Sequence, residues 1–136
     1  MCIFCDIIRH EIPSKVVYED DQVLAILDIS QVTKGHTLVM PKKHVENLLE
    51  CDDETAARLI QVVKKLAVQI QERTGAAAIN ILNNNGEIAG QTVNHLHFHI
   101  IPRYNENDAF VCEFKESEKQ DLDEVLNLIK SSRKLS

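Results

Sequence analysis

Three histidines alternate with apolar residues in one short stretch of the chain, His95-Leu96-His97-Phe98-His99-Ile100-Ile101. Because strand side chains alternate between faces, the imidazoles would share one face and the apolar residues the other. Imidazole titrates near neutrality, so such a face could supply an uncharged nucleophile or an acid at cellular pH. Metal ligation and a plain solvated face are the alternatives that the stretch alone leaves open.

Small and polar residues precede this stretch and could accommodate a phosphate. Gly86 and the sequence Gly90-Gln91-Thr92 would let backbone amides approach an anion closely, and Thr92 adds a hydroxyl. His36 and His44 form a second histidine patch. The chain contains no G-x-x-x-x-G-K-[ST] sequence, so nothing supports a P-loop mechanism.

Two cysteines near the N-terminus, Cys2 and Cys5, are spaced as C-x-x-C. Such a pair can be part of a metal site, a redox motif or two free buried thiols. The redox motif should follow a strand, and only Met1 precedes the pair, which disfavours that alternative. Cys51 and Cys112 fit no ligand spacing and are expected to be ordinary thiols.

Together these residues resemble the histidine triad (HIT) family, whose defining motif is His-apolar-His-apolar-His-apolar-apolar. The resemblance spans residues 2 to about 104, and the chain looks most like bacterial members near the histidine triad nucleotide-binding (Hint) branch. Besides the triad it includes Asp-Ile-Ser at 28–30, Gly-His-Thr-Leu-Val at 35–39, Pro-Lys-Lys-His at 41–44, Asn84 and Gly-Gln-Thr at 90–92.

The resemblance implies nucleotide chemistry centred on His97. This histidine would attack the α-phosphorus of a nucleotide and form a covalent nucleotidyl-histidine, which water then hydrolyses. His99, the Thr92 hydroxyl and the amides of the turn at 90–92 would stabilise the charge of the transition state, and His36 would orient a partner. No metal is required for this step.

The resemblance also implies a pocket for a purine nucleotide. Asp28 would accept hydrogen bonds from the ribose hydroxyls, and Asn84, Gly90 and Gln91 would lie near the phosphate. Apolar residues would form the walls around the base: Ile3, Phe4, Ile7, Ile26, Leu27 and Ile29. On local sequence alone, Asp28 is equally well a turn acid and the apolar residues are equally well core.

Some relatives of this family hold zinc with such a cysteine pair and two histidines. The matching residues here are Cys2, Cys5, His44 and His95, which would make a closed structural zinc site. Such a site would tie the N-terminal segment to the histidine stretch. The resemblance further implies a homodimer, with the long helix and a sheet strand at its interface.

We therefore expect a hydrolase of purine nucleoside phosphoramidates or related nucleotidyl conjugates. The alternatives are a dinucleoside polyphosphate hydrolase, a nucleotide-binding regulator with incidental turnover, and a metal carrier, which would leave Asp28, Asn84 and Thr92 unexplained. His99 favours the hydrolases, because related transferases usually carry glutamine there. The chain lacks Trp and departs from eukaryotic Hint proteins after residue 104, so their leaving-group pocket is not carried over.

Patterning predicts the elements that position these residues. Strands are expected at 16–18, 23–27, 36–40, 76–82 and 94–102, with a short helix at 2–9 and an amphipathic helix around 122–129. A helix over 53–74 would begin at an Asp52 or Asp53 cap, end at Gly75 and bury one face: Ala56, Leu59, Ile60, Val63, Leu66, Ala67 and Ile70. This order predicts an α+β fold built on an antiparallel sheet of about five strands.

Composition sets the remaining bounds. The chain has 136 residues and a formal charge of -6, which disfavours general binding to nucleic acid or to anionic membranes. It has no apolar run of transmembrane length and no basic segment before its first apolar stretch, so neither a membrane span nor a signal peptide is expected. Four cysteines in such a chain indicate a reducing, cytoplasmic compartment. One domain over 1–136 is expected, with 105–136 as an extension packing on it.

Overall fold

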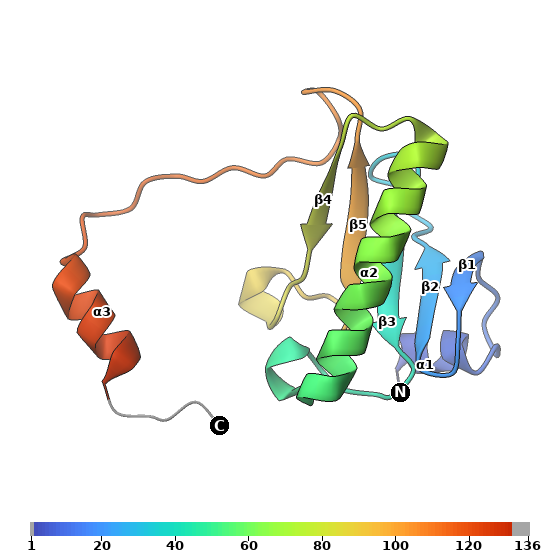
Figure 1. Ribbon diagram of the computed structural model, residues 1–136, viewed down its shortest axis with the longest axis horizontal. Helices are drawn as coiled ribbons and strands as arrows, with labels where there is room; N and C mark the ends of the chain where they lie inside the picture. The colour runs from blue at the N-terminus through green and yellow to red at the C-terminus, as the bar shows by residue number, and fades with distance from the viewer. Residues whose placement is uncertain (1, 132–136) are drawn as a thin grey trace.

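In the computed structural model, which describes residues 2–131, five antiparallel strands form one sheet in the order β1-β2-β3-β5-β4 (Figure 1). The strands are β1 Val16–Glu19, β2 Val23–Leu27, β3 Thr37–Pro41, β4 Ala78–Leu82 and β5 Phe98–Arg103. The helices are α1 Ile3–Ile8, α2 Asp53–Thr74 and α3 Leu122–Lys130, and the 3-10 turns are η1 Leu48–Glu50 and η2 Glu87–Ala89. The predicted α+β class with a five-stranded antiparallel sheet is confirmed.

An apolar core lies on each face of the sheet. As a result, β2 and β3 are buried along almost their whole length. Alternate residues such as Ala25 and Val39 belong to a core shared with α2. The residues that point to the other face of the sheet, such as Ile26, pack with Phe4 and Ile7 of α1. The six-residue helix α1 is therefore held by the sheet beneath it, since a helix this short is not stable alone.

Helix α2 lies across the sheet, and its ends are those that the sequence predicts. A side-chain oxygen of Asp52 accepts a hydrogen bond from Thr55 N–H (3.0 Å), and Gly75 ends the helix in the left-handed conformation (φ 74°). The predicted apolar face is largely buried, but Ile60 is 46% exposed and Val62 is buried instead. No helix within residues 2–131 combines the length and apolar character needed to cross a membrane.

Strand β5 begins at Phe98, so the expected strand over 94–102 is wrong at its start. The pairing of β3 with β5 stops at Val39 and Phe98, and the Leu96 amide donates instead to the backbone oxygen of Val45 (2.8 Å). The chain before Phe98 stays extended, and the alternation of faces persists. Leu96 lies in the α2 core, whereas the histidines on either side of it contact α1.

The C-terminal segment leaves the body of the molecule. The chain runs extended from about residue 109 and then forms α3, which lies apart from the sheet and from α2 (Figure 1). Residues 111–121 are mostly charged or polar and offer little apolar surface for the body to bury. Leu122 and Ile129 of α3 are 78% and 77% exposed. Residues 105–110 stay against the body through Asp108 and Phe110, whereas 111–131 lie apart from it. That 105–136 forms an extension packing on the domain stays a prediction, and 132–136 lie outside the described residues.

The core between α2 and the sheet predicts a contrast between two positions on one helix. Leu66→Ala should lower the free energy of unfolding by about 2–5 kcal/mol, because Leu66 is buried and its removal leaves a cavity. Gln69→Ala, at an exposed position of the same helix, should change it by about 0.5 kcal/mol or less. Urea unfolding of both variants measures the difference. Equal losses would contradict the assignment of this face to the core.

Candidate active site and metal centre

His97 is buried, and its hydrogen bond leaves one nitrogen free for attack. Its Nδ1 lies 2.7 Å from the backbone oxygen of His95. A carbonyl can only accept, so Nδ1 carries the proton and Nε2 keeps its lone pair. Phe4 packs edge-on against the ring, with 5.0 Å between the ring centroids. The ring is thus held in one orientation with an uncharged nucleophilic nitrogen.

A second series of hydrogen bonds determines which ring nitrogen carries the proton in His36 and in His99. Val32 N–H donates to Nδ1 of His36 (3.4 Å), which places the His36 proton on Nε2. That nitrogen lies 2.9 Å from Nδ1 of His99 and 3.7 Å from a carboxylate oxygen of Asp28. His99 therefore accepts at Nδ1 and keeps its proton on Nε2. The ring centroids of His97 and His99 are 5.1 Å apart, so a nucleophile and a donor are neighbours.

Burial keeps these imidazoles uncharged. It lowers the pKa of His99 to about 4, assisted by repulsion from His97 and His36. It also lowers the pKa of His36 and of His97, against the attraction of the nearby Asp28 carboxylate. The site therefore presents neutral rings at pH 7.

A pair of asparagines, missed by the sequence analysis, fixes the backbone of His97. Asn83 donates from Nδ2 to the backbone oxygen of His97 (3.0 Å). Asn85 donates to the Asn83 side-chain oxygen (2.7 Å) and accepts from Leu48 N–H (2.8 Å). These bonds connect the backbone of His97 to η1. Nothing in a run of three loop asparagines indicates which of them point inward, so Asn84 alone was predicted.

The glycine turn at 86–92 is held mainly by its own hydrogen bonds. The amides of Gly90 and Gln91 donate to the backbone oxygens of Glu87 and Gly86, at 3.0 and 3.1 Å. Both amides are thus engaged within the turn, and their proposed role near a phosphate stays a prediction. Among residues 2–131, the Thr92 amide has no protein acceptor.

Two other residues predicted near the phosphate also bond to this turn. The buried Gln91 side chain donates to the backbone oxygen of Glu46 (2.6 Å) and accepts from Gly86 N–H (2.8 Å). Asn84 donates to the backbone oxygen of Gly90 (3.4 Å). Gly90 has a φ of 104°, and a Cβ there would lie 3.3 Å from the Asn84 side chain. The turn therefore requires glycine at this position.

Thr92 itself is exposed and borders a hollow of about 690 Å³. The hollow is shared with the cysteine pair and its neighbours: Cys2, Ile3, Cys5, Arg9, His44, Glu46, Val93 and Asn94. The structure thus places the Thr92 hydroxyl at an open surface beside the cysteine pair.

An apolar hollow of about 620 Å³ opens beside Asp28. One carboxylate oxygen of Asp28 accepts from Ser30 N–H (2.8 Å), which orients the group. Most of the predicted base-pocket residues line this hollow: Ile3, Ile7, Ile26, Leu27 and Ile29. Phe4 lies elsewhere, buried against the rings of His95 and His97. An apolar hollow with one oriented carboxylate at its rim suits a base with its attached sugar.

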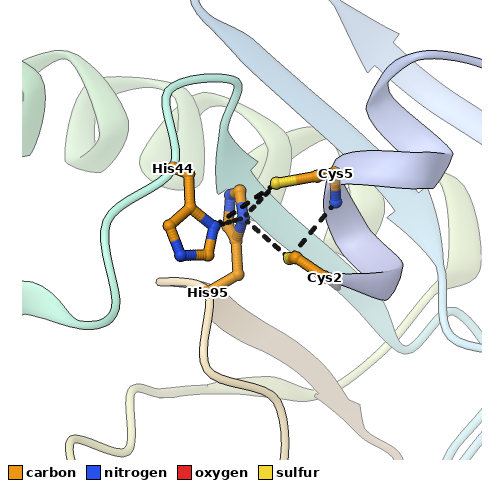
Figure 2. A group of neighbouring side chains, drawn as sticks. All are labelled: Cys2, Cys5, His44 and His95. Carbon is orange, nitrogen blue, oxygen red and sulfur yellow. Dashed lines mark hydrogen bonds between the residues drawn. The ribbon is translucent and has the colours of Figure 1, made fainter.

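Four potential metal ligands converge beside α1 (Figure 2). Cys2 and Cys5 come from the start of α1, His44 follows β3, and His95 precedes β5. Their ligand atoms all lie within 4.8 Å of one another. The Nδ1 atoms of the two histidines are 3.2 Å apart, and the sulfur–nitrogen distances are 3.3, 3.4 and 3.6 Å. The structure brings together the four residues that the sequence predicts.

The donor chemistry of this cluster fits a cation. His95 Nε2 lies 2.8 Å from the backbone oxygen of Pro41, so the proton is on Nε2 and Nδ1 presents a lone pair to the cluster. Around a tetrahedral zinc, sulfur and nitrogen ligands are separated by about 3.5 Å and two nitrogens by about 3.3 Å. The distances in the cluster match both values. The four residues are therefore compatible with a zinc ion.

The model of the HIT domain family matches residues 9–106 of this chain. The chain belongs to the HIT family. The crystal structure of a HIT family member from Bacillus subtilis is 49% identical, with a TM-score of 0.91 and coverage of 99% of both chains. The resemblance carried by the triad motif is thereby confirmed.

Two further HIT relatives have informative names. An adenosine 5'-monophosphoramidase of Schizosaccharomyces pombe is 46% identical over 105 residues, which are 77% of this chain and 76% of that protein. A zinc-bound histidine triad family protein of Mycobacterium smegmatis is 38% identical, with a TM-score of 0.75, over 87% of this chain and 84% of that one.

The burial of His99 predicts how stability changes with pH. The folded chain keeps this ring neutral down to about pH 4, whereas the unfolded chain takes up a proton below about pH 6.5. The free energy of unfolding should therefore fall as the pH falls from 6.5 to 4, by at most about 1.4 kcal/mol per pH unit for this proton. His99→Gln removes the proton, so the variant should lose less stability than the parent between pH 7 and pH 5 in urea unfolding.

Both proteins in that comparison keep the other five histidines, so the difference between their curves reports the replacement of His99. Parallel curves for parent and variant would contradict a neutral, half-buried His99.

Proposed function

We propose that this HIT protein hydrolyses the bond between the α-phosphate of a purine nucleotide and an amine or related leaving group. One observation carries the proposal. His97 presents an unprotonated Nε2, while the neighbouring His99 retains a proton on Nε2. A nucleophile beside a donor is what displacement at phosphorus requires. The monophosphoramidase of S. pombe, 46% identical, supports the proposal.

In the proposed reaction, the Nε2 lone pair of His97 attacks the α-phosphorus, and the bond to the leaving group breaks as the nitrogen–phosphorus bond forms. The leaving group takes a proton from water. The His97 ring then carries a positive charge, which the His95 backbone oxygen stabilises at Nδ1. His99 and the Thr92 hydroxyl donate to the non-bridging oxygens. A second water attacks phosphorus, breaks the nitrogen–phosphorus bond and releases the mononucleotide with neutral His97.

The remaining residues would bind or position the substrate. The base would occupy the hollow that Ile7 and Ile26 line, and the Asp28 carboxylate would accept from the ribose hydroxyls. His36 would not touch substrate. It would hold the proton of His99 on Nε2 through the 2.9 Å hydrogen bond between their rings.

Two alternatives use the same site. A dinucleoside polyphosphate hydrolase would attack the same phosphorus with His97 and expel a longer phosphate chain. A nucleotide-binding regulator would use the hollow beside Asp28 with slow turnover. Rates on nucleoside phosphoramidates and on dinucleoside polyphosphates, each with purine and pyrimidine bases, distinguish these alternatives.

We also infer that Cys2, Cys5, His44 and His95 hold a structural zinc ion. The zinc-bound HIT protein of M. smegmatis supports this inference. The ion would fix α1 against the segment that carries His97, and it would take no part in the bond-breaking step.

We further infer that the chain forms a homodimer through α2 and β4. β4 is an edge strand with open hydrogen-bonding groups, and partly exposed apolar residues lie nearby: Ile60 and Val68 on α2 and Ile81 on β4. The cytoplasmic location drawn from the cysteine content stays a prediction.

The zinc inference predicts metal content. The chain purified without chelator should contain about one zinc per chain, because a closed four-ligand site retains its metal. Cys5→Ser should lose most of it and unfold at a lower temperature, whereas Cys51→Ser should keep it. Elemental analysis and thermal unfolding measure both. Metal-free parent protein whose Cys2 and Cys5 react readily with a thiol reagent would refute the inference.

The proposed reaction predicts a covalent adduct on His97. Rapid quenching during turnover of a purine nucleoside phosphoramidate, followed by digestion and mass spectrometry, should find a nucleotidyl group on the peptide that contains residue 97. His97→Ala should lower kcat by about 1,000-fold or more and still bind the mononucleotide. His10→Asn, at an exposed histidine outside the site, should retain full activity. Normal turnover by His97→Ala would exclude this nucleophile.

A further inference from the structure

The body of the molecule fixes the direction in which the C-terminal segment leaves. The Asp108 carboxylate accepts from Arg103 Nε (3.0 Å) and from the Tyr104 amide (2.9 Å). The Tyr104 hydroxyl donates to the backbone oxygen of Lys34 (2.5 Å), and Arg103 lies over the ring of Phe110 (5.4 Å to its centroid). The segment beyond, residues 111–131, is called the arm here. The residues just before the arm are anchored, so the direction in which the arm starts is set by the fold.

The arm ends in a helix whose apolar stripe lacks cover from its own chain. Leu122, Val125, Leu126 and Ile129 recur at the spacing of one helix face. Leu122, Leu126 and Ile129 are more than half exposed. A nine-residue helix is not stable in water by itself, and such helices persist by burying their apolar face against another surface.

The same course recurs in a solved relative. The B. subtilis HIT structure superposes with a TM-score of 0.91 over 99% of both chains. Residues 111–131 are too large a share of the 136 for that score to be reached if they took another direction. The two proteins are 49% identical, and an arm that protrudes in the same direction in both needs a surface to pack against. Within residues 2–131, the body of the same chain does not provide that surface.

The position of the arm indicates what the support is. The arm passes on the β4 side of the sheet, and α3 lies beyond that edge (Figure 1). This is the edge with the open groups of β4 and the exposed Ile81, next to Ile60 and Val68 of α2. A second copy seated at this edge would come within reach of α3. Two-fold symmetry would then return the second copy's arm to the first.

We propose that the two copies of the homodimer exchange arms, so that the apolar stripe of α3 packs on the body of the other copy. This proposal rests on the homodimer inferred above and adds a specific contact to it. The interface at β4 and α2 holds the bodies together, and the reciprocal arms enclose them.

The test uses full chains in which an arm lysine and a body lysine can be crosslinked. Light and isotopically heavy chains are unfolded and refolded together with zinc, and native mass spectrometry verifies mixed dimers. A lysine crosslinker should then join Lys119 or Lys130 to Lys64 or Lys65 in pairs of one light and one heavy peptide. If the mixed dimers give only crosslinked pairs of two light or two heavy peptides, each arm contacts its own body. That result would overturn the arm exchange but not the homodimer.

A charge in the stripe gives an independent measurement. Leu126→Glu should weaken dimerisation by about tenfold or more in sedimentation, since a carboxylate would be buried in an apolar contact. Asn127→Glu adds the same charge on the opposite side of α3 and should leave the dimer unchanged. Unchanged dimerisation of Leu126→Glu would overturn the arm exchange alone. A monomeric parent chain would overturn both the exchange and the homodimer.

Discussion

The hydrogen bonds of His95 are the constraint on which the rest of the site depends. Its Nε2–H donates to the backbone oxygen of Pro41 at the end of β3, and its own backbone oxygen accepts from His97. Its Nδ1 faces the two cysteines and His44. One buried residue therefore connects the sheet, the N-terminal helix and the nucleophile. Its backbone oxygen also determines which nitrogen is free on the His97 ring, because that oxygen can accept only from a protonated Nδ1.

The histidines of this site differ in task although they share one stretch of chain. His97 and His99 have their protons on opposite nitrogens, because one donates at Nδ1 to a carbonyl and the other accepts there from His36. Burial keeps both rings neutral, so these assignments hold at pH 7. The pattern depends on the fold as much as on residue type, since Val32 and the His95 carbonyl set it from outside the rings.

The sequence predicts most reliably what depends on local periodicity and capping. The ends of α2 follow from Asp52 and Gly75, and the opposite faces of Leu96 and its flanking histidines follow from the alternation of an extended chain. Backbone partners are not encoded in periodicity, so the sequence does not reveal that the amides of Gly90 and Gln91 donate to backbone oxygens of their own turn. An amphipathic pattern over 122–129 predicts an apolar stripe correctly but contains no information about which body covers it.

Helix α1 contributes to two sites through opposite sides. Cys2 and Cys5 face the ligand cluster, while Ile3 and Ile7 line the hollow proposed for the base. A ligand that immobilises this short helix at one of the two sites lowers the ordering entropy that the other must supply. If both proposed ligands bind, occupancy of the two sites is therefore coupled, and each ligand raises the affinity for the other by the same factor. The shared helix α1 would then connect zinc binding to the affinity for nucleotide.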